Sequence, residues 1–127
     1  MDEKVLMLAA MAAREHAHCK YSGFAVGAAL LTDDGQIYTG CNVENASYSL
    51  GCCAERTAIF KAVSDGKREF SAIAICGAPK GDEPDAPCIP CGACLQVMAE
   101  FCGDDFPIVL SDGVHVLKEF LPVRFTL

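Results

Sequence analysis

Two short cysteine segments constrain the fold of this 127-residue chain more than any other feature. The first is Cys53-Ala54-Glu55-Arg56, and the second is Pro90-Cys91-Gly92-Ala93-Cys94. Three thiolates can hold a zinc ion on three sides and leave its fourth position open to water, which is how a catalytic zinc site differs from a structural one. The two segments lie far apart in the chain, so a shared metal requires a fold that brings them together.

Length, charge and cysteine count narrow the class of protein. The chain has the length of one average domain, and we expect residues 1–127 to form a single domain. No apolar run approaches the ~20 residues of a membrane span, and the acidic start lacks a signal-peptide pattern. Nine cysteines, an odd number, indicate a reducing cytoplasmic location rather than a disulfide framework. A formal charge of −7 disfavours nucleic acid, so the expected partner is small and uncharged.

Hydrophobic periodicity predicts an alternation of helices and strands. Apolar residues at helical spacing predict helices over residues 2–19, 53–63 and 91–102. Apolar runs bounded by turn residues predict strands over residues 24–31, 36–43, 70–76, 106–110 and 114–120. The four prolines within residues 78–90 predict a loop.

This order of elements predicts an α/β fold, a three-layer α/β/α sandwich around a mixed five-stranded sheet. The last two strands form an antiparallel hairpin, because only residues 111–113 connect them. Strand 70–76 would lie near the centre of the sheet, between the two thiol-bearing helices. Both helices would then start at the same edge of the sheet, where α/β folds place their sites.

The residues around the thiols suit a catalytic metal centre. A helix N-terminus favours thiolates, and Cys91 and Cys94 share a face of the first helical turn. Cys53 should lie at the edge of its helix, because Glu55 would otherwise point away from it. The Glu55 carboxylate could then move protons for the water, and the Arg56 guanidinium could bond two sulfurs and offset the charge of three thiolates.

The cysteine spacing leaves alternatives open. Cys88 and Cys91 also fit a Pro-Cys-x-x-Cys pattern, and with Cys53 and Cys94 they could form a closed, structural four-thiolate site. We favour Cys91 and Cys94, because Cys94 extends the apolar stripe of its helix while Cys88 lies in the proline-rich loop. A thioredoxin-like redox pair is a weaker alternative, because it leaves the Glu-Arg pair without a role. The other cysteines are expected to be small buried apolar residues: Cys19, Cys41, Cys52, Cys76 and Cys102.

A polar pair ends the second strand of the first hairpin. Strand alternation puts Asn42 and Glu44 on one face, where an amide and a carboxylate could hold two neighbouring hydroxyls. From the pattern alone we favour the simpler interpretation, in which both are ordinary turn residues at the end of a strand. His16 and His18, two apart on the expected first helix, do not face each other and do not predict a metal site.

Four stretches carry a more specific pattern: residues 21–30 (YSGFAVGAAL), 42–48 (NVENASY), 53–58 (CAERTA) and 90–96 (PCGACLQ). Together they resemble the small homotetrameric zinc-dependent cytidine deaminases. The resemblance implies the fold of that family, one Zn²⁺ per subunit and a homotetramer with shared active sites. It also implies a catalytic domain that hydrolyses cytidine and 2′-deoxycytidine to uridine and 2′-deoxyuridine, with release of ammonia.

The resemblance also implies roles for individual residues. Cys53, Cys91 and Cys94 would be the zinc ligands, and Glu55 would carry a proton from zinc-bound water to N3 of cytosine before helping ammonia leave. The side chains of Asn42 and Glu44 would bind the ribose. Tyr48 and Phe125 would act across a subunit boundary. The full set of substrate contacts would be Phe24, Asn42, Glu44, Tyr48, Ala54 and Phe125. Leu95 stands where the family commonly has arginine, and Phe120 replaces a leucine of the family's tail pattern.

Three other functions are the alternatives to cytidine deamination for these motifs. A deaminase of a cytosine-nucleoside antibiotic such as blasticidin S is the nearest alternative, but the Asn42 and Glu44 pair favours the simple nucleoside. A polynucleotide-editing enzyme is disfavoured, because Glu44 near a ribose hydroxyl would repel a phosphodiester. A non-catalytic zinc-binding module with four cysteine ligands is the alternative from another class.

Overall fold

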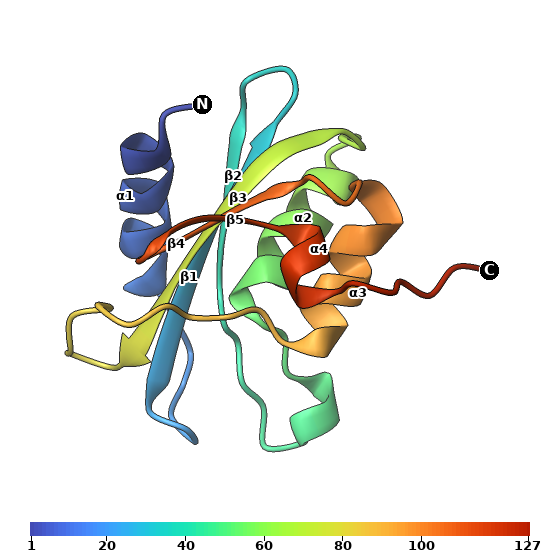
Figure 1. Ribbon diagram of the computed structural model, residues 1–127. Helices are drawn as coiled ribbons and strands as arrows, with labels where there is room; N and C mark the ends of the chain where they lie inside the picture. Colours follow the sequence, from blue (N-terminus) through green and yellow to red (C-terminus); the bar gives the residue numbers. More distant parts are fainter.

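The computed structural model describes all residues, 1–127 (Figure 1). Its elements, in chain order, are α1 (Glu3–Arg14), β1 (Phe24–Thr32), β2 (Ile37–Cys41), the 3₁₀ turn η1 (Tyr48–Leu50), α2 (Ala54–Ser64), β3 (Phe70–Pro79), α3 (Gly92–Phe101), β4 (Pro107–Leu110), β5 (Gly113–Val116) and α4 (Leu117–Phe120). None of the helices is long and apolar enough to cross a membrane.

The five strands form one mixed sheet in the order β2-β1-β3-β4-β5. Strand β3 is central and runs antiparallel to β1 and parallel to β4, while β4 and β5 form an antiparallel hairpin. The predicted mixed sheet, its central strand and its final hairpin are therefore confirmed.

Helices cover both faces of the sheet, as the sequence predicted (Figure 1). On one face, Leu6 and Ala10 of α1 pack against small residues of the strands, including Ala72 and Ala74 of β3. On the other face, α2 and α3 pack against larger β3 residues such as Ile73. Strand β3 is buried from both sides because its side chains alternate between these two layers.

The first helix is shorter than predicted, and the expectation of a helix over residues 2–19 is wrong beyond Arg14. Arg14 is only 7% exposed, and its guanidinium donates to the carbonyl oxygens of Ala25, Ala78 and Pro79. Farther along, the His18 N–H donates to the Asn42 carbonyl at 2.9 Å. The N–H groups of Glu15, His16 and Ala17 still form local turn bonds, to carbonyls three residues earlier. From His18 on, a tertiary hydrogen bond takes the place of the helical one.

The last predicted strand, residues 114–120, is also wrong beyond Val116, because Leu117–Phe120 form the short helix α4. The Glu119 carboxylate accepts the Val116 N–H at 3.2 Å. It also contacts His115 Nδ1 at 2.9 Å, and Asp112 contacts His115 Nε2 at 2.8 Å. These two carboxylates, Asp112 foremost, raise the pKa of His115. Leu117 is fully buried, so packing favours the helical turn.

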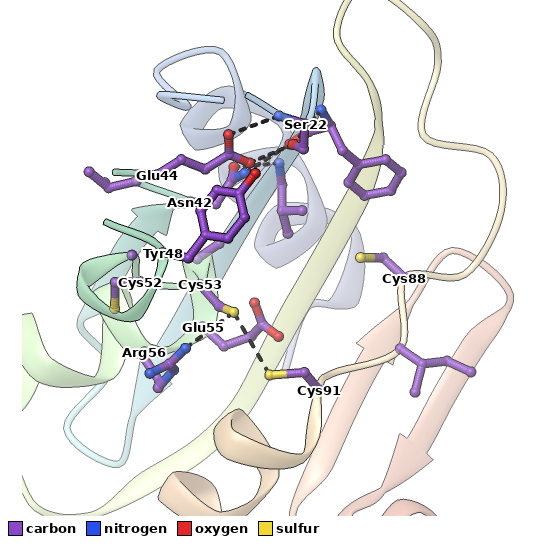
Figure 2. Close-up of a pocket in the computed structure, with 16 residues that line it drawn as sticks. Ser22, Asn42, Glu44, Tyr48, Cys52, Cys53, Glu55, Arg56, Cys88 and Cys91 are labelled. Atoms are coloured by element: carbon purple, nitrogen blue, oxygen red, sulfur yellow. Dashed lines mark hydrogen bonds between the residues drawn. The ribbon is translucent and has the colours of Figure 1, made fainter. Parts of the chain in front are cut away.

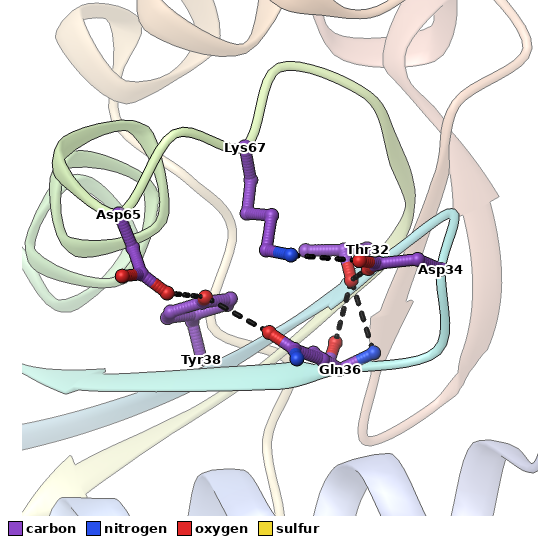
Figure 3. A network of polar contacts seen from close by, with 6 residues as sticks. All are labelled: Thr32, Asp34, Gln36, Tyr38, Asp65 and Lys67. Atoms are coloured by element: carbon purple, nitrogen blue, oxygen red, sulfur yellow. Dashed lines mark hydrogen bonds and ion pairs between the residues drawn. The ribbon is translucent and has the colours of Figure 1, made fainter.

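A polar network ties the β1–β2 turn to the C-terminal end of α2 (Figure 3). Lys67 Nζ forms an ion pair with Asp34 at 2.7 Å, and the Tyr38 hydroxyl bonds to both Asp65 and Gln36. The opposite end of α2 approaches β2 closely, because Gly40 has no side chain between them. Both ends of α2 are therefore positioned by the first hairpin.

Candidate active site

A pocket of about 480 Å³ lies where the N-terminal ends of α2 and α3 meet the start of β1. Nine of its lining residues were named from the sequence, and Figure 2 shows most of them around one cavity: Phe24, Asn42, Glu44, Tyr48, Cys53, Ala54, Glu55, Arg56 and Cys91. Cys94 is fully buried beneath the pocket, next to Cys91. Phe125 is the exception, because it lies outside this cavity on the exposed C-terminal tail.

The three sulfurs have the spacing of a metal site. Cys53 Sγ lies 3.8 Å from Cys91 Sγ, and Cys91 Sγ lies 3.6 Å from Cys94 Sγ. A tetrahedral zinc ion with Zn–S bonds of about 2.3 Å places its sulfurs about 3.8 Å apart. The three thiols therefore fit zinc as they stand, with the side facing the pocket left open.

Cys88 is not part of this cluster. The side chains close enough to share one metal ion are those of Cys53, Cys91 and Cys94. Cys88 lines the same pocket but packs toward β3, where a Cβ on Gly77 would lie 2.7 Å from its sulfur. Burial raises the pKa of the Cys88 thiol to about 11, which favours its neutral form. The geometry supports the predicted choice of Cys91 and Cys94 as ligands with Cys53, and it disfavours the closed four-thiolate alternative.

The helix ends explain why these thiols come together. Cys53 and Cys91 are the N-cap residues of α2 and α3, both with extended backbone, as expected for Cys53 from the sequence. Hydrogen bonds from the Cys94 thiol and from Arg56 lower the pKa of Cys53 to about 5. The pKa of Cys94 is raised, first because it shares its proton with Cys53 and then because it is buried. A divalent cation among the three sulfurs would replace that shared proton.

Arg56 and Glu55 flank the cluster on the first turn of α2. Arg56 Nη2 donates to Cys53 Sγ at 3.4 Å, which is the contact that the sequence predicted. Its Nε is buried and has no partner in the protein. Glu55 is 4% exposed and burial raises the pKa of its carboxyl, although its side chain points into the pocket (Figure 2). A buried carboxyl with a raised pKa can both accept and return a proton near neutral pH.

Asn42 is held against β1 at the far end of the pocket from the thiols. Its Oδ1 accepts the Val26 N–H at 2.8 Å, and its Nδ2 donates to the Phe24 carbonyl at 2.8 Å. The amide nitrogen keeps one free N–H. These two backbone contacts fix the orientation of the amide, which lines the cavity.

Glu44 is held by the turn that precedes β1. Its Oε1 accepts the N–H groups of Tyr21 and Ser22, and its Oε2 accepts the Ser22 hydroxyl. These hydrogen bonds, that of the Ser22 hydroxyl first, lower the pKa of Glu44. A carboxylate offers about four acceptor sites, so roughly one remains, on Oε2. The free N–H of Asn42 and this acceptor site therefore leave one hydrogen-bonding position on each side chain for a hydroxyl of a ligand.

Tyr48 and Phe125 are the most exposed of the predicted site residues. Tyr48 is 81% exposed at the rim of the pocket and contacts the Tyr21 ring edge-on, with ring centroids 6.4 Å apart. Phe125 is 67% exposed, and its carbonyl accepts a hydrogen bond from Gln96. Their roles across a subunit boundary remain predictions.

Sequence reasoning missed several residues that line the pocket. Ser22 was noted only as part of a family-like stretch, although it contacts Glu44 directly. No local signal distinguishes it from an ordinary turn serine. The other lining residues that were given no role from the sequence are Val26, Val43, Gly51, Cys52 and Ile89, whereas Cys88 had been named as a metal ligand of the closed alternative. Cys41 and Cys52, expected to be buried, are instead half-exposed.

Comparisons with known proteins agree with this geometry. A family model described as the cytidine and deoxycytidylate deaminase zinc-binding region matches residues 1–110. A protein named cytidine deaminase from Sporosarcina psychrophila is 53% identical, over 88% of this chain and 79% of its own length. One from Halalkalibacterium halodurans is 47% identical, over 99% of this chain and 96% of its own.

The fold also matches a solved cytidine deaminase structure, whereas a blasticidin-S deaminase is more distant in sequence. The crystal structure of cytidine deaminase from Burkholderia pseudomallei superposes with a TM-score of 0.87 at 48% identity, over 98% of this chain and 100% of that one. A protein named blasticidin-S deaminase from Bacillus cereus is only 32% identical, over 80% of this chain and 76% of its own length. The chain therefore belongs to the cytidine and deoxycytidylate deaminase family, and its three-cysteine cluster fits the zinc site of that family.

Proposed function

We propose that this chain is a cytidine deaminase, which hydrolyses cytidine and 2′-deoxycytidine to uridine and 2′-deoxyuridine and releases ammonia. The observation that carries the proposal is the position of Glu55, buried beside three thiols spaced for zinc and pointing into the same pocket that Asn42 and Glu44 line. Close relatives named cytidine deaminase support the same activity.

Cys53, Cys91 and Cys94 would hold one zinc ion. When bound, zinc supplies a Lewis acid that lowers the pKa of a coordinated water. Arg56 would offset the negative charge of three thiolates through its contact with Cys53. The open side of the cluster faces the cavity, so a substrate can reach it.

Glu55 would move the protons of the reaction. The overall change is replacement of the amino group on C4 of cytosine by oxygen from water. Glu55 would accept a proton from the attacking water and deliver it to N3 of the ring. It would then take the proton of the new C4 hydroxyl and transfer it to the amine, so that the C4–N bond breaks, ammonia leaves and the C4 carbonyl forms. Its buried carboxyl, with a raised pKa, suits a group that alternates between both forms.

The other lining residues would bind the nucleoside. Asn42 and Glu44 would bind the ribose, the amide through its free N–H and the carboxylate through the free acceptor site of Oε2. Phe24 would pack against the nucleoside, and Ala54 would contact the base beside the thiols.

We also propose a cytoplasmic homotetramer whose subunits share active sites through Tyr48 and Phe125. The exposure of these two rings supports this assembly, and all nine cysteines are free, as a reducing compartment requires. Light scattering on the purified protein would give the mass of the assembly. A monomer with full activity would exclude the shared-site proposal.

Ammonia release from cytidine, 2′-deoxycytidine and blasticidin S by the zinc-loaded protein tests the activity. We expect turnover of the two simple nucleosides and little of the antibiotic; exclusive turnover of the antibiotic would contradict the proposal.

Glu55→Gln should retain zinc and lose about 10³-fold or more in kcat, because both proton transfers need the carboxyl. Glu3→Gln, on exposed α1, serves as the matched control. Near-normal turnover by Glu55→Gln would refute the assigned role.

A further inference from the structure

We propose that Ser22 is a positioning residue for nucleoside binding, because its hydroxyl holds the Glu44 carboxylate in the orientation that receives a sugar hydroxyl. This inference rests on the proposed function for the identity of the ligand, whereas the contact between the two side chains is independent of it. Figure 2 shows Ser22 and Glu44 facing each other at the rim of the pocket.

The contacts of the two carboxylate oxygens differ. Oε1 accepts two backbone N–H groups, from Tyr21 at 3.0 Å and from Ser22 at 3.1 Å, so its acceptor sites are filled. Oε2 accepts only the Ser22 hydroxyl. The remaining acceptor site of Glu44 is therefore on the oxygen that Ser22 holds, and a sugar hydroxyl would bind directly beside the serine.

Ser22 also joins this carboxylate to the start of β1. Its hydroxyl oxygen accepts the Phe24 N–H at 3.0 Å while its proton goes to Glu44. One hydroxyl thus links a sugar-binding side chain to the strand that carries Phe24. A hydroxyl that donates one hydrogen bond and accepts another has a fixed orientation, which preorganises both neighbours.

The turn itself does not depend on Ser22. Gly23 has φ +71°, which an L side chain rarely adopts, and its backbone anchors the turn twice. The Gly23 N–H donates to the Cys19 carbonyl at 2.7 Å, and the Gly23 carbonyl accepts the Lys80 N–H at 2.7 Å. Replacing Ser22 with alanine therefore removes one hydroxyl and leaves the chain path in place.

The experiment compares cytidine with 2′,3′-dideoxycytidine, which lacks both ring hydroxyls. Ser22→Ala should raise KM for cytidine about fivefold, change KM for the dideoxynucleoside less than about twofold and leave kcat within about twofold. The reason is that Glu44 reaches the nucleoside only through the sugar, while Phe24 keeps its place in β1 through its pairing with Pro79 of β3. Ser22→Thr keeps the hydroxyl and should restore KM. Ser64→Ala, an exposed serine on α2, is the control and should match wild type.

A second measurement does not require turnover. In zinc-loaded protein with ¹³C-labelled glutamate, the carboxyl of Glu44 should titrate at higher pH in Ser22→Ala than in wild type, because the hydroxyl stabilises the ionised form. Equal KM penalties on both nucleosides, or an unchanged Glu44 titration, would overturn the inference. Wild-type protein without activity on cytidine would instead refute the proposed function, and the titration would still decide the role of Ser22.

Discussion

Replacing Gly40 with alanine tests whether the close packing of α2 on β2 sets the geometry of the active site. A Cβ at Gly40 would lie 2.5 Å from both the Ala54 carbonyl oxygen and the Ala58 nitrogen, and 3.0 Å from Thr57 Cβ. The two nearest atoms are backbone atoms of α2, which cannot rotate away. The helix start must therefore move away from the strand by about 0.9 Å or more, from 2.5 Å to at least 3.4 Å, to reach ordinary contact distances.

The loss of folding stability in Gly40→Ala follows from that displacement. Overpacking of this kind costs about 2 kcal/mol, which corresponds to about 8 °C in melting temperature for a domain of this size. Ala54 lies between Cys53 and Glu55, so the same movement displaces a thiol and the proposed proton carrier together. We expect kcat/KM to fall by about 10- to 100-fold, because catalysis is sensitive to displacements of this size.

Melting temperature, zinc content and kcat/KM for cytidine would be measured on the same preparation. Gly103→Ala is the matched control, because a Cβ there meets no atom within 4 Å and the backbone φ is ordinary. It should behave like wild type. Wild-type stability and turnover in Gly40→Ala would refute the packing argument, and lower stability with full turnover would show that α2 is not coupled to catalysis.

Three further predictions concern other parts of the chain. Cys94→Ser should lower zinc affinity by about 100-fold or more, whereas Cys88→Ser should keep one zinc per chain by elemental analysis; equal losses would favour the four-thiolate site. Arg56→Gln should lose zinc to a chelator at a rate about 10-fold higher than wild type, and Arg56→Lys should lose it at an intermediate rate. An unchanged rate of zinc loss would mean that Arg56 has only a structural role. The raised pKa of His115 means that its ion pairs stabilise the fold fully below about pH 6.5 and lose that effect as pH rises through the raised pKa. The difference in unfolding free energy between wild type and His115→Gln should therefore shrink from about pH 6 to pH 9, and a constant difference would contradict the assignment.

The sequence predicted the centre of the site well, because the signals there are local. Cys53 and Cys91 each begin a helix, and residues three apart on a first turn share a face. Cys94 could therefore be paired with Cys91 from this spacing together with the apolar stripe that Cys94 extends, which Cys88 does not. Arg56 could be placed against Cys53 by the same rule. The order of strands and helices likewise predicted the layers and the central strand, because each element carries its own hydrophobic period.

The two largest errors in the predicted element ends arose because tertiary contacts override local periodicity. The pattern that predicts α1 continues past Arg14, but the guanidinium of Arg14 and the N–H of His18 bond to distant carbonyls instead. The apolar residues after Val116 fit a strand equally well, yet burial of Leu117 and the cap by Glu119 favour a helical turn. The periodicity of a short stretch of sequence does not reveal these tertiary partners.

The sequence by itself therefore determined the chemistry of this protein: three thiols, a carboxylate and a guanidinium at spacings that suit zinc. The tertiary structure decided which groups share a cavity, how closely α2 approaches β2 at Gly40, and that the Ser22 hydroxyl meets Glu44. The physical reason is that side-chain type and helical spacing are properties of neighbours in the chain. Contacts between residues 22 and 44, or between a strand and the helix packed on it, exist only once the whole sheet has formed.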